Sequence, residues 1–140
     1  MEAVNALRDR MDASFVLQTL EYLKKGGRCS TIAALGANLL RLRPEIEVND
    51  GTMGVGRKYR GTAQKSVEDY IRGRLEGRSD IDLTRVFVTH TRMDEGILSA
   101  AVALVKSLQP FAEVIVNDAG CTVSSHCGPG CLGVIFMKKA

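Results

Sequence analysis

A hairpin signal near the middle of the chain limits the folds that the chain can adopt. Glu45–Val48 alternates charged and apolar residues, Asn49-Asp50-Gly51 is a strong turn sequence, and Thr52–Tyr59 supplies a return strand. An antiparallel hairpin interrupts the strand–helix alternation that a doubly wound parallel sheet requires. The sequence therefore predicts an α+β fold, a two-layer sandwich in which helices pack on a mixed sheet.

The remaining elements follow from apolar spacing and from the signals at helix ends. Gly26-Gly27 ends one helix, Thr62 begins another, and Asp94 or Thr91 caps a third. We expect helices over residues 2–11, 18–25, 30–42, 62–75 and 94–108, and further strands over 15–17, 86–88, 112–116 and 134–137. At 140 residues the chain fits a single domain spanning residues 1–140.

Composition excludes several classes of protein. The net charge is +3, which is too small to indicate a nucleic-acid surface by itself. No apolar run approaches the roughly 20 residues of a membrane span, and the charged N-terminus lacks the apolar core of a signal peptide. We therefore expect a cytoplasmic protein with no membrane insertion. Nucleic-acid binding through Gly56–Arg60 and Arg72–Arg78 is the weakest hypothesis, because the chain has no Trp and only three Tyr for base stacking.

The segment Gly120–Gly133 carries most of the polar chemistry. It places four glycines, three hydroxyl residues, three thiols and His126 between two apolar strands. Its formal G-x-G-x-x-G match is rejected, because a strand rather than a helix follows. We interpret the segment as a glycine-rich bend that holds a carboxylate or phosphate through hydroxyls, backbone N–H groups and the imidazole. The competing interpretation is a histidine whose polar atoms are satisfied by backbone alone.

The cysteines of this segment permit a second class of function. Cys121, His126, Cys127 and Cys131 are possible zinc ligands or parts of a thiol-based module. The spacing lacks paired C-x-x-C knuckles, however, and small buried thiols also simply fill space. In an extended chain His126 and Cys127 point to opposite sides, so we assign no catalytic residue and expect a protein that is not an enzyme.

Three segments taken together add a resemblance. Leu20–Arg28 reads LEYLKKGGR, Leu39–Pro44 and Ile46–Gly51 read LLRLRP and IEVNDG, and His126–Gly130 reads HCGPG. In this order and separation they resemble the C-terminal half of DegV-family proteins, from about Asp12 to Phe136. The resemblance implies that chain 1–140 is the C-terminal lobe of a DegV-like protein, with the N-terminal lobe absent.

The resemblance also implies a function. DegV proteins of this kind are non-catalytic carriers whose ligand is a long-chain fatty acid, without a cofactor, and some present that fatty acid to a separate fatty acid kinase. By resemblance His126 matches the histidine near the carboxylate, Ser125 belongs to the same ligand site and Val123 lines the acyl tunnel. Arg28 and Arg60 match positions that dock the kinase. The apolar face of Ile32, Leu35 and Leu39 lines either the acyl tunnel or the core.

Two departures qualify that expectation. Cys127 follows the histidine where the family usually has threonine, and Cys131 replaces threonine or a small apolar residue. The hydroxyl-bearing N-terminal domain that holds the carboxylate in DegV proteins has no counterpart in the sequence. We therefore expect the isolated domain to bind fatty acid weakly or not at all, because a buried carboxylate without partners is costly. We expect the apolar surface meant for the absent domain to be exposed to solvent or covered by a second copy of the chain.

Overall fold

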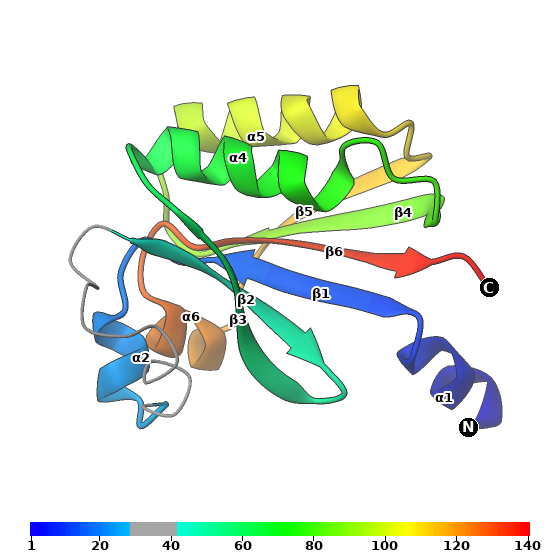
Figure 1. The fold of residues 1–140 in the computed structure, drawn as a ribbon, viewed down its shortest axis with the longest axis horizontal. Helices are drawn as coiled ribbons and strands as arrows, with labels where there is room; N and C mark the ends of the chain where they lie inside the picture. The colour runs from blue at the N-terminus through cyan, green and yellow to red at the C-terminus, as the bar shows by residue number, and fades with distance from the viewer. Residues whose placement is uncertain (29–41) are drawn as a thin grey trace.

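The computed structural model describes residues 1–28 and 42–140. Its helices are α1 (Glu2–Arg8), α2 (Glu21–Lys25), α4 (Ala63–Leu75), α5 (Glu95–Leu108) and α6 (Cys121–Cys127). Its strands are β1 (Met11–Val16), β2 (Arg43–Asn49), β3 (Thr52–Tyr59), β4 (Ile81–His90), β5 (Glu113–Asp118) and β6 (Leu132–Lys138) (Figure 1). The helix expected over residues 30–42, with Ile32, Leu35 and Leu39, lies almost wholly outside the described residues.

The six strands form one mixed sheet in the order β3-β2-β1-β6-β4-β5. The pair β4–β5 is parallel, and the other neighbouring pairs are antiparallel. The hairpin β2–β3 turns at Asp50 and Gly51, both of which adopt a positive φ, as a tight hairpin turn requires. The expected α+β fold with a mixed sheet is confirmed.

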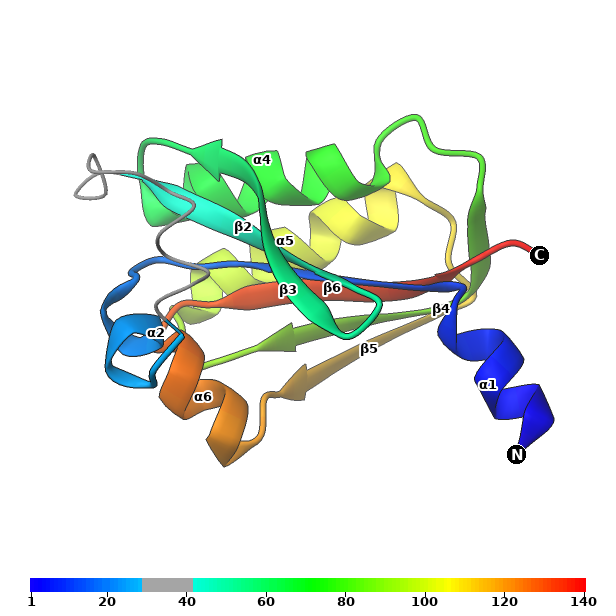
Figure 2. The same ribbon diagram turned by 60° about the horizontal axis from the view of Figure 1, so that its bottom comes forward.

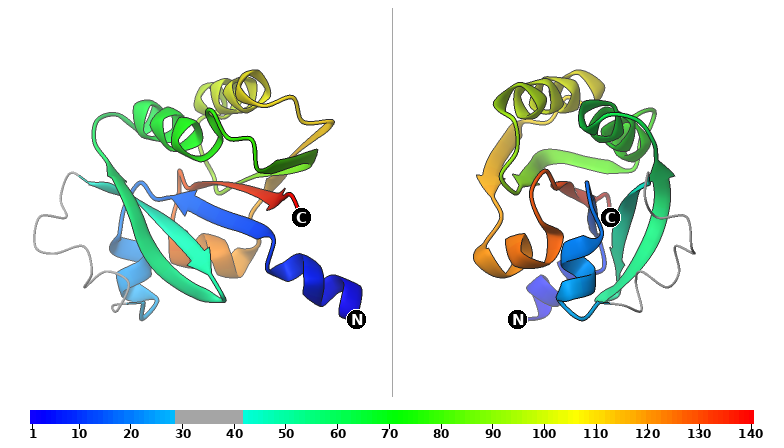
Figure 3. Two further views of the ribbon diagram at one scale, coloured as in Figure 1. Left: turned by 45° about the vertical axis from the view of Figure 1, so that its right-hand side comes forward. Right: turned by 90° about the vertical axis from the view of Figure 1, so that its left-hand side faces the viewer.

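Helices α4 and α5 lie side by side on one face of the sheet and form the second layer with it (Figure 1). Thr62 and Asp94 cap these helices through their side chains, as expected. The main core fills the space beneath them with alternate residues of β4 and β6, including Val86, Val88, Val134 and Phe136. The two short helices α2 and α6 lie beside one another on the opposite face, at one end of the sheet (Figures 2 and 3).

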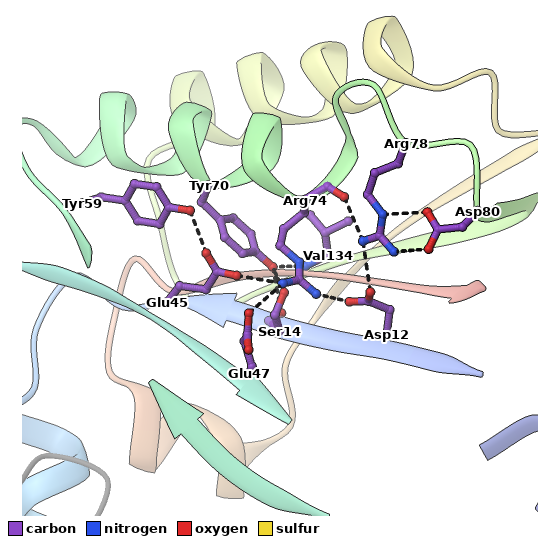
Figure 4. Close-up of polar contacts among 10 residues, drawn as sticks. All are labelled: Asp12, Ser14, Glu45, Glu47, Tyr59, Tyr70, Arg74, Arg78, Asp80 and Val134. Atoms are coloured by element: carbon purple, nitrogen blue, oxygen red, sulfur yellow. Dashed lines mark hydrogen bonds and ion pairs between the residues drawn. The ribbon is translucent and has the colours of Figure 1, made fainter. Parts of the chain in front are cut away.

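A buried tyrosine links α4 to the centre of the sheet. The Tyr70 hydroxyl donates to the Ser14 carbonyl at 2.8 Å and accepts from the Val134 N–H at 2.9 Å (Figure 4). Ser14 and Val134 face each other across β1 and β6, so one hydroxyl joins the backbones of both strands. Burial raises the pKa of Tyr70 well above its usual range, which keeps the phenol neutral.

Next to Tyr70, Arg74 reaches from α4 into a group of carboxylates. Its guanidinium bonds to Asp12, and at 3.0 Å to both Glu45 and Glu47 (Figure 4). Tyr59 donates to the other Glu45 oxygen at 2.7 Å. Because Glu45 is almost fully buried, these partners offset the cost of removing its charge from water. The network fixes β1, β2 and β3 beneath α4.

The structure corrects several boundaries and one element. Strand β1 begins at Met11, the last residue of the first expected helix, and β4 begins at Ile81, before the strand expected over residues 86–88. The main error concerns residues 121–127, interpreted as part of an extended, glycine-rich bend, which form the helix α6. Gly120 and Gly128 flank that helix, and Gly128 has φ of 74° and ψ of −178°, a conformation that essentially only glycine adopts.

Candidate functional site

The sheet face opposite α4 and α5 carries an apolar groove of about 300 Å³. Its floor is made by the residues that alternate with the core positions, because successive side chains of a strand point to opposite faces. The apolar and small lining residues are Ala13, Phe15, Val48, Val123, Cys131, Gly133 and Ile135. Helix α6 forms the wall at one end through Val123, which is 50% exposed.

A second hollow of about 290 Å³ continues the groove along the same face. The two share Ile135, and the second is lined also by Met11, Phe87 and Met137. From Cys131 to Met137 the strand β6 extends about 20 Å. This is comparable with the extended length of a palmitoyl chain.

Polar groups form one rim of the groove at the ends of β4 and β5. Thr89 donates to Asn117 at 3.0 Å, and His90 Nε2 lies 3.6 Å from an Asp118 carboxylate oxygen. All four residues line the groove. An apolar floor with a few polar groups on its rim suits an amphiphilic ligand.

Helices α2 and α6 interlock through two rings that pack on two glycines. The His126 ring lies against Gly26, where an added Cβ would come within 2.5 Å of His126 Cδ2. In return, a Cβ on Gly128 would lie 2.4 Å from the Tyr22 ring. Side chains at these glycines would therefore displace the rings. The interlock explains why YLKKGGR and HCGPG occur together, since each segment supplies one ring and one glycine.

The polar atoms of His126 are oriented by its own helix. Its Nδ1 lies 2.7 Å from the Thr122 carbonyl, which can only accept, so Nδ1 carries a hydrogen. The neutral ring therefore has a bare Nε2. Arg28 also contacts Gly26, because its guanidinium donates to the Gly26 carbonyl at 3.3 Å. The Arg28 guanidinium and the His126 imidazole therefore both contact Gly26 at the end of α2.

A buried threonine, which the sequence interpretation did not select as a site residue, holds the loop after α6. The Thr91 hydroxyl donates to the Gly128 carbonyl at 2.6 Å and accepts from the Cys131 N–H at 3.0 Å. The Gly130 N–H donates to the Arg92 carbonyl at 2.8 Å. These bonds fix the segment that joins His126 to the groove floor.

The structure separates the site residues suggested by the sequence. Val123 lines the groove, whereas His126 lies one helical turn further along α6, half-buried against α2. Ser125 is exposed and donates to the Cys121 carbonyl at 2.8 Å rather than facing the groove. Arg28 and Arg60 are both exposed, but they follow different elements, α2 and β3.

Several groove residues were missed, although the sequence carries a signal for them. Phe87 lies within Val86-Phe87-Val88, and Ile135 lies within Val134-Ile135-Phe136-Met137. Unbroken apolar runs are typical of strands that are covered on both faces, whereas one solvated face gives alternation. Phe87 is nevertheless 37% exposed, so part of this second face remains uncovered.

The zinc alternative finds no support in the geometry. Cys121 is exposed at the start of α6, whereas Cys127 and Cys131 are buried on its inner side and His126 turns toward α2. Within residues 1–28 and 42–140, no three His, Cys, Asp or Glu side chains are arranged to hold a metal ion.

Comparison with protein families matches residues 1–139 to the model of the DegV family of uncharacterised proteins. The chain belongs to the DegV family. A fatty acid-binding protein of Thermotoga maritima is 30% identical over 137 residues, which cover 94% of this chain and 47% of that relative. The chain spans about half the length of the relatives it matches.

Solved DegV structures share the fold. A DegV-family protein of Thermus thermophilus, described for its fatty acid binding, has a TM-score of 0.76 at 32% identity and covers 99% of this chain and 50% of its own. A DegV-family protein of Eubacterium eligens loaded with heptadecanoic acid has a TM-score of 0.80 at 20% identity, over 99% of this chain and 49% of its own. Both of these DegV-family proteins therefore bind fatty acids. None of the helices that the structure describes has the length and apolar character of a membrane span.

Proposed function

We propose that this chain is a non-catalytic lipid carrier domain that supplies the acyl-chain side of a fatty-acid site. The groove on the open sheet face takes the hydrocarbon chain, and His126 contacts the carboxylate. The observation that carries this proposal is the position of α6, which presents Val123 to the groove and His126 one turn later. Residues three apart on a helix lie on the same side, about 5–6 Å apart. The head group therefore lies beyond one end of the apolar floor.

The energetics favour the hydrocarbon chain over the head group. Burying an acyl chain contributes about 0.8 kcal/mol per methylene, and the floor offers Phe15, Phe87 and Ile135 as partners. The carboxylate needs several donors, and each charge-assisted hydrogen bond contributes about 1.5–3 kcal/mol. His126 and Arg28 are the basic groups nearest the end of α6 that the contacts above identify.

We infer that the isolated chain binds palmitate weakly, because most carboxylate donors of the family lie in the other lobe. Calorimetric titration is expected to give an affinity weaker than micromolar. Submicromolar one-to-one binding would contradict this inference. Mass spectrometry of lipids that co-purify with the protein supplies an independent measurement.

A photoreactive palmitate maps the site even when binding is weak. We expect cross-links to peptides that contain Val123, Ile135 or Phe87, and a large loss in Val123→Asp. The matched control is Val4→Asp, because Val4 is also an exposed helical valine but lies on α1, where no residue is buried. Cross-links confined to the α5 side of the sheet, near Val116, would refute the groove assignment.

Docking of a fatty acid kinase at Arg28 and Arg60 is a second proposal. It is supported by the family resemblance and by the exposure of both arginines. Arg28→Glu and Arg60→Glu are expected to lower acyl phosphate formation by the kinase, whereas Arg8→Glu on α1 leaves it unchanged. Equal rates in all three variants would refute the docking role.

Self-association through the open face is a third proposal. Met11 and Phe87 expose apolar surface on that face, and a second copy would cover it. Sedimentation is expected to detect a dimer that Phe87→Asp dissociates. A monomer at all concentrations, without a dye-binding patch, would refute it.

A further inference from the structure

Two of the thiols lie together in a small apolar cluster, apart from the main core. Cys127 ends α6 and Cys131 precedes β6, and each is only 4% exposed. Their buried neighbours come from three other parts of the chain, namely Leu17, Leu23 and Ile46. Cys131 also lines the groove, so the pair lies directly under its floor.

The loop between the two cysteines is fixed at both ends. Gly128 and Gly130 adopt φ of 74° and 76°, so that the chain reverses within Gly128-Pro129-Gly130. The Thr91 hydroxyl bonds to the Gly128 carbonyl and to the Cys131 N–H. The two cysteines are thereby held in one buried cluster, four residues apart along the chain.

This arrangement distinguishes the two sulfur atoms chemically. The hydrogen bond from Cys131 lowers the pKa of Cys127, whereas the same bond together with burial raises the pKa of Cys131. The thiolate is the reactive form of cysteine, so Cys127 is the better nucleophile and Cys131 holds a proton beside it.

We propose that Cys127 and Cys131 form a reversible dithiol–disulfide pair that closes on reaction with a small peroxide. The Cys127 thiolate attacks one oxygen of hydrogen peroxide, the O–O bond breaks, and the sulfur becomes a sulfenic acid as hydroxide leaves and is protonated to water. The Cys131 sulfur then attacks the Cys127 sulfur, an S–S bond forms, and the S–O bond breaks to release a second water, which takes up the Cys131 proton. Both electrons that reduce the peroxide come from the two thiols.

The groove supplies the route to these buried atoms, because Cys131 forms part of its floor. Closing the pair joins the end of α6, next to His126, to the first residues of β6. The redox state of the pair is thereby tied to the site without any requirement for bound fatty acid. The proposal therefore stands or falls independently of the carrier function.

The test uses the full chain with Cys29→Ser and Cys121→Ser, which leaves only the pair. The folded protein is treated with hydrogen peroxide, quenched with catalase, denatured, alkylated with N-ethylmaleimide and weighed by mass spectrometry. We expect a product that takes up no label, has lost two hydrogens and recovers both thiols with dithiothreitol. Its formation is expected to be at least about tenfold faster than thiol loss in Cys127→Ser made in the same background. Cys131→Ser is expected to stop at a sulfenic acid on Cys127 and to form no intramolecular disulfide.

Three outcomes would overturn the proposal: two alkylatable thiols after treatment, sulfinic acid as the product, or thiol loss no faster than in Cys127→Ser. Circular dichroism checks that each variant is folded. Peptide mapping of the oxidised, unsubstituted chain identifies which cysteines are joined and so tests the same pair without any substitution. A bond that involves Cys29 or Cys121 in place of the pair would count against it.

Discussion

The glycine beneath the His126 ring is the most informative position to change. Gly26 has φ of −78°, which alanine adopts without strain, so the backbone tolerates Gly26→Ala. The new Cβ would lie 2.5 Å from His126 Cδ2 and 3.0 Å from Nε2, inside van der Waals contact. The ring must therefore move, although its Nδ1 is held at 2.7 Å by the Thr122 carbonyl.

The expected cost follows from these contacts. Displacing the ring loses a hydrogen bond of about 0.5–1.5 kcal/mol and overpacks the α2–α6 contact by about 1–3 kcal/mol. Replacing glycine by alanine returns about 0.4–1 kcal/mol through the unfolded state. We expect Gly26→Ala to lower the free energy of unfolding by about 0.5–4 kcal/mol, measured by urea denaturation.

A double-mutant cycle isolates the ring. In a His126→Ala background the clash is gone, so Gly26→Ala is expected to stabilise the protein by about 0.4–1 kcal/mol. Gly54→Ala is the matched control, because no heavy atom of the described residues, 1–28 and 42–140, lies within 4 Å of its added Cβ. If Gly26→Ala changes stability equally with and without the imidazole, the interlock does not exist. If the interlock exists, the yield of palmitate cross-links in Gly26→Ala should match that in His126→Ala.

Two further predictions follow from the same geometry. Thr91→Ala removes the hydroxyl that bonds to the Gly128 carbonyl and the Cys131 N–H, so we expect the free energy of unfolding in urea to fall by about 2–4 kcal/mol. Thr91→Ser keeps the hydroxyl and is expected to lose little. Equal losses in the two variants would refute the role of the hydroxyl. Tyr70→Phe removes the bridge between β1 and β6 and is expected to cost about 1–3 kcal/mol, with Tyr22→Phe as the control; an unchanged midpoint would contradict it.

Much of the fold was predictable because its signals are local. Asn49-Asp50-Gly51 specifies its turn through backbone conformation, and Thr62 and Asp94 cap their helices with their own side chains. Helix α6 was missed because its serines suggested a polar bend, yet Ser124 and Ser125 bond back to carbonyls four or five residues earlier. The glycines at both of its ends were the overlooked signal.

The sequence by itself determined the mixed sheet, the caps and the membership of a family, because turn residues, periodicity and motif order are written along the chain. Only the tertiary structure decided that His126 packs on Gly26, that Tyr22 packs on Gly128, and that Cys127 meets Cys131 above a shared apolar cluster. These contacts depend on how α2 and α6 dock on one end of the sheet. Docking is set by side-chain volume in three dimensions, which no local pattern of residues records.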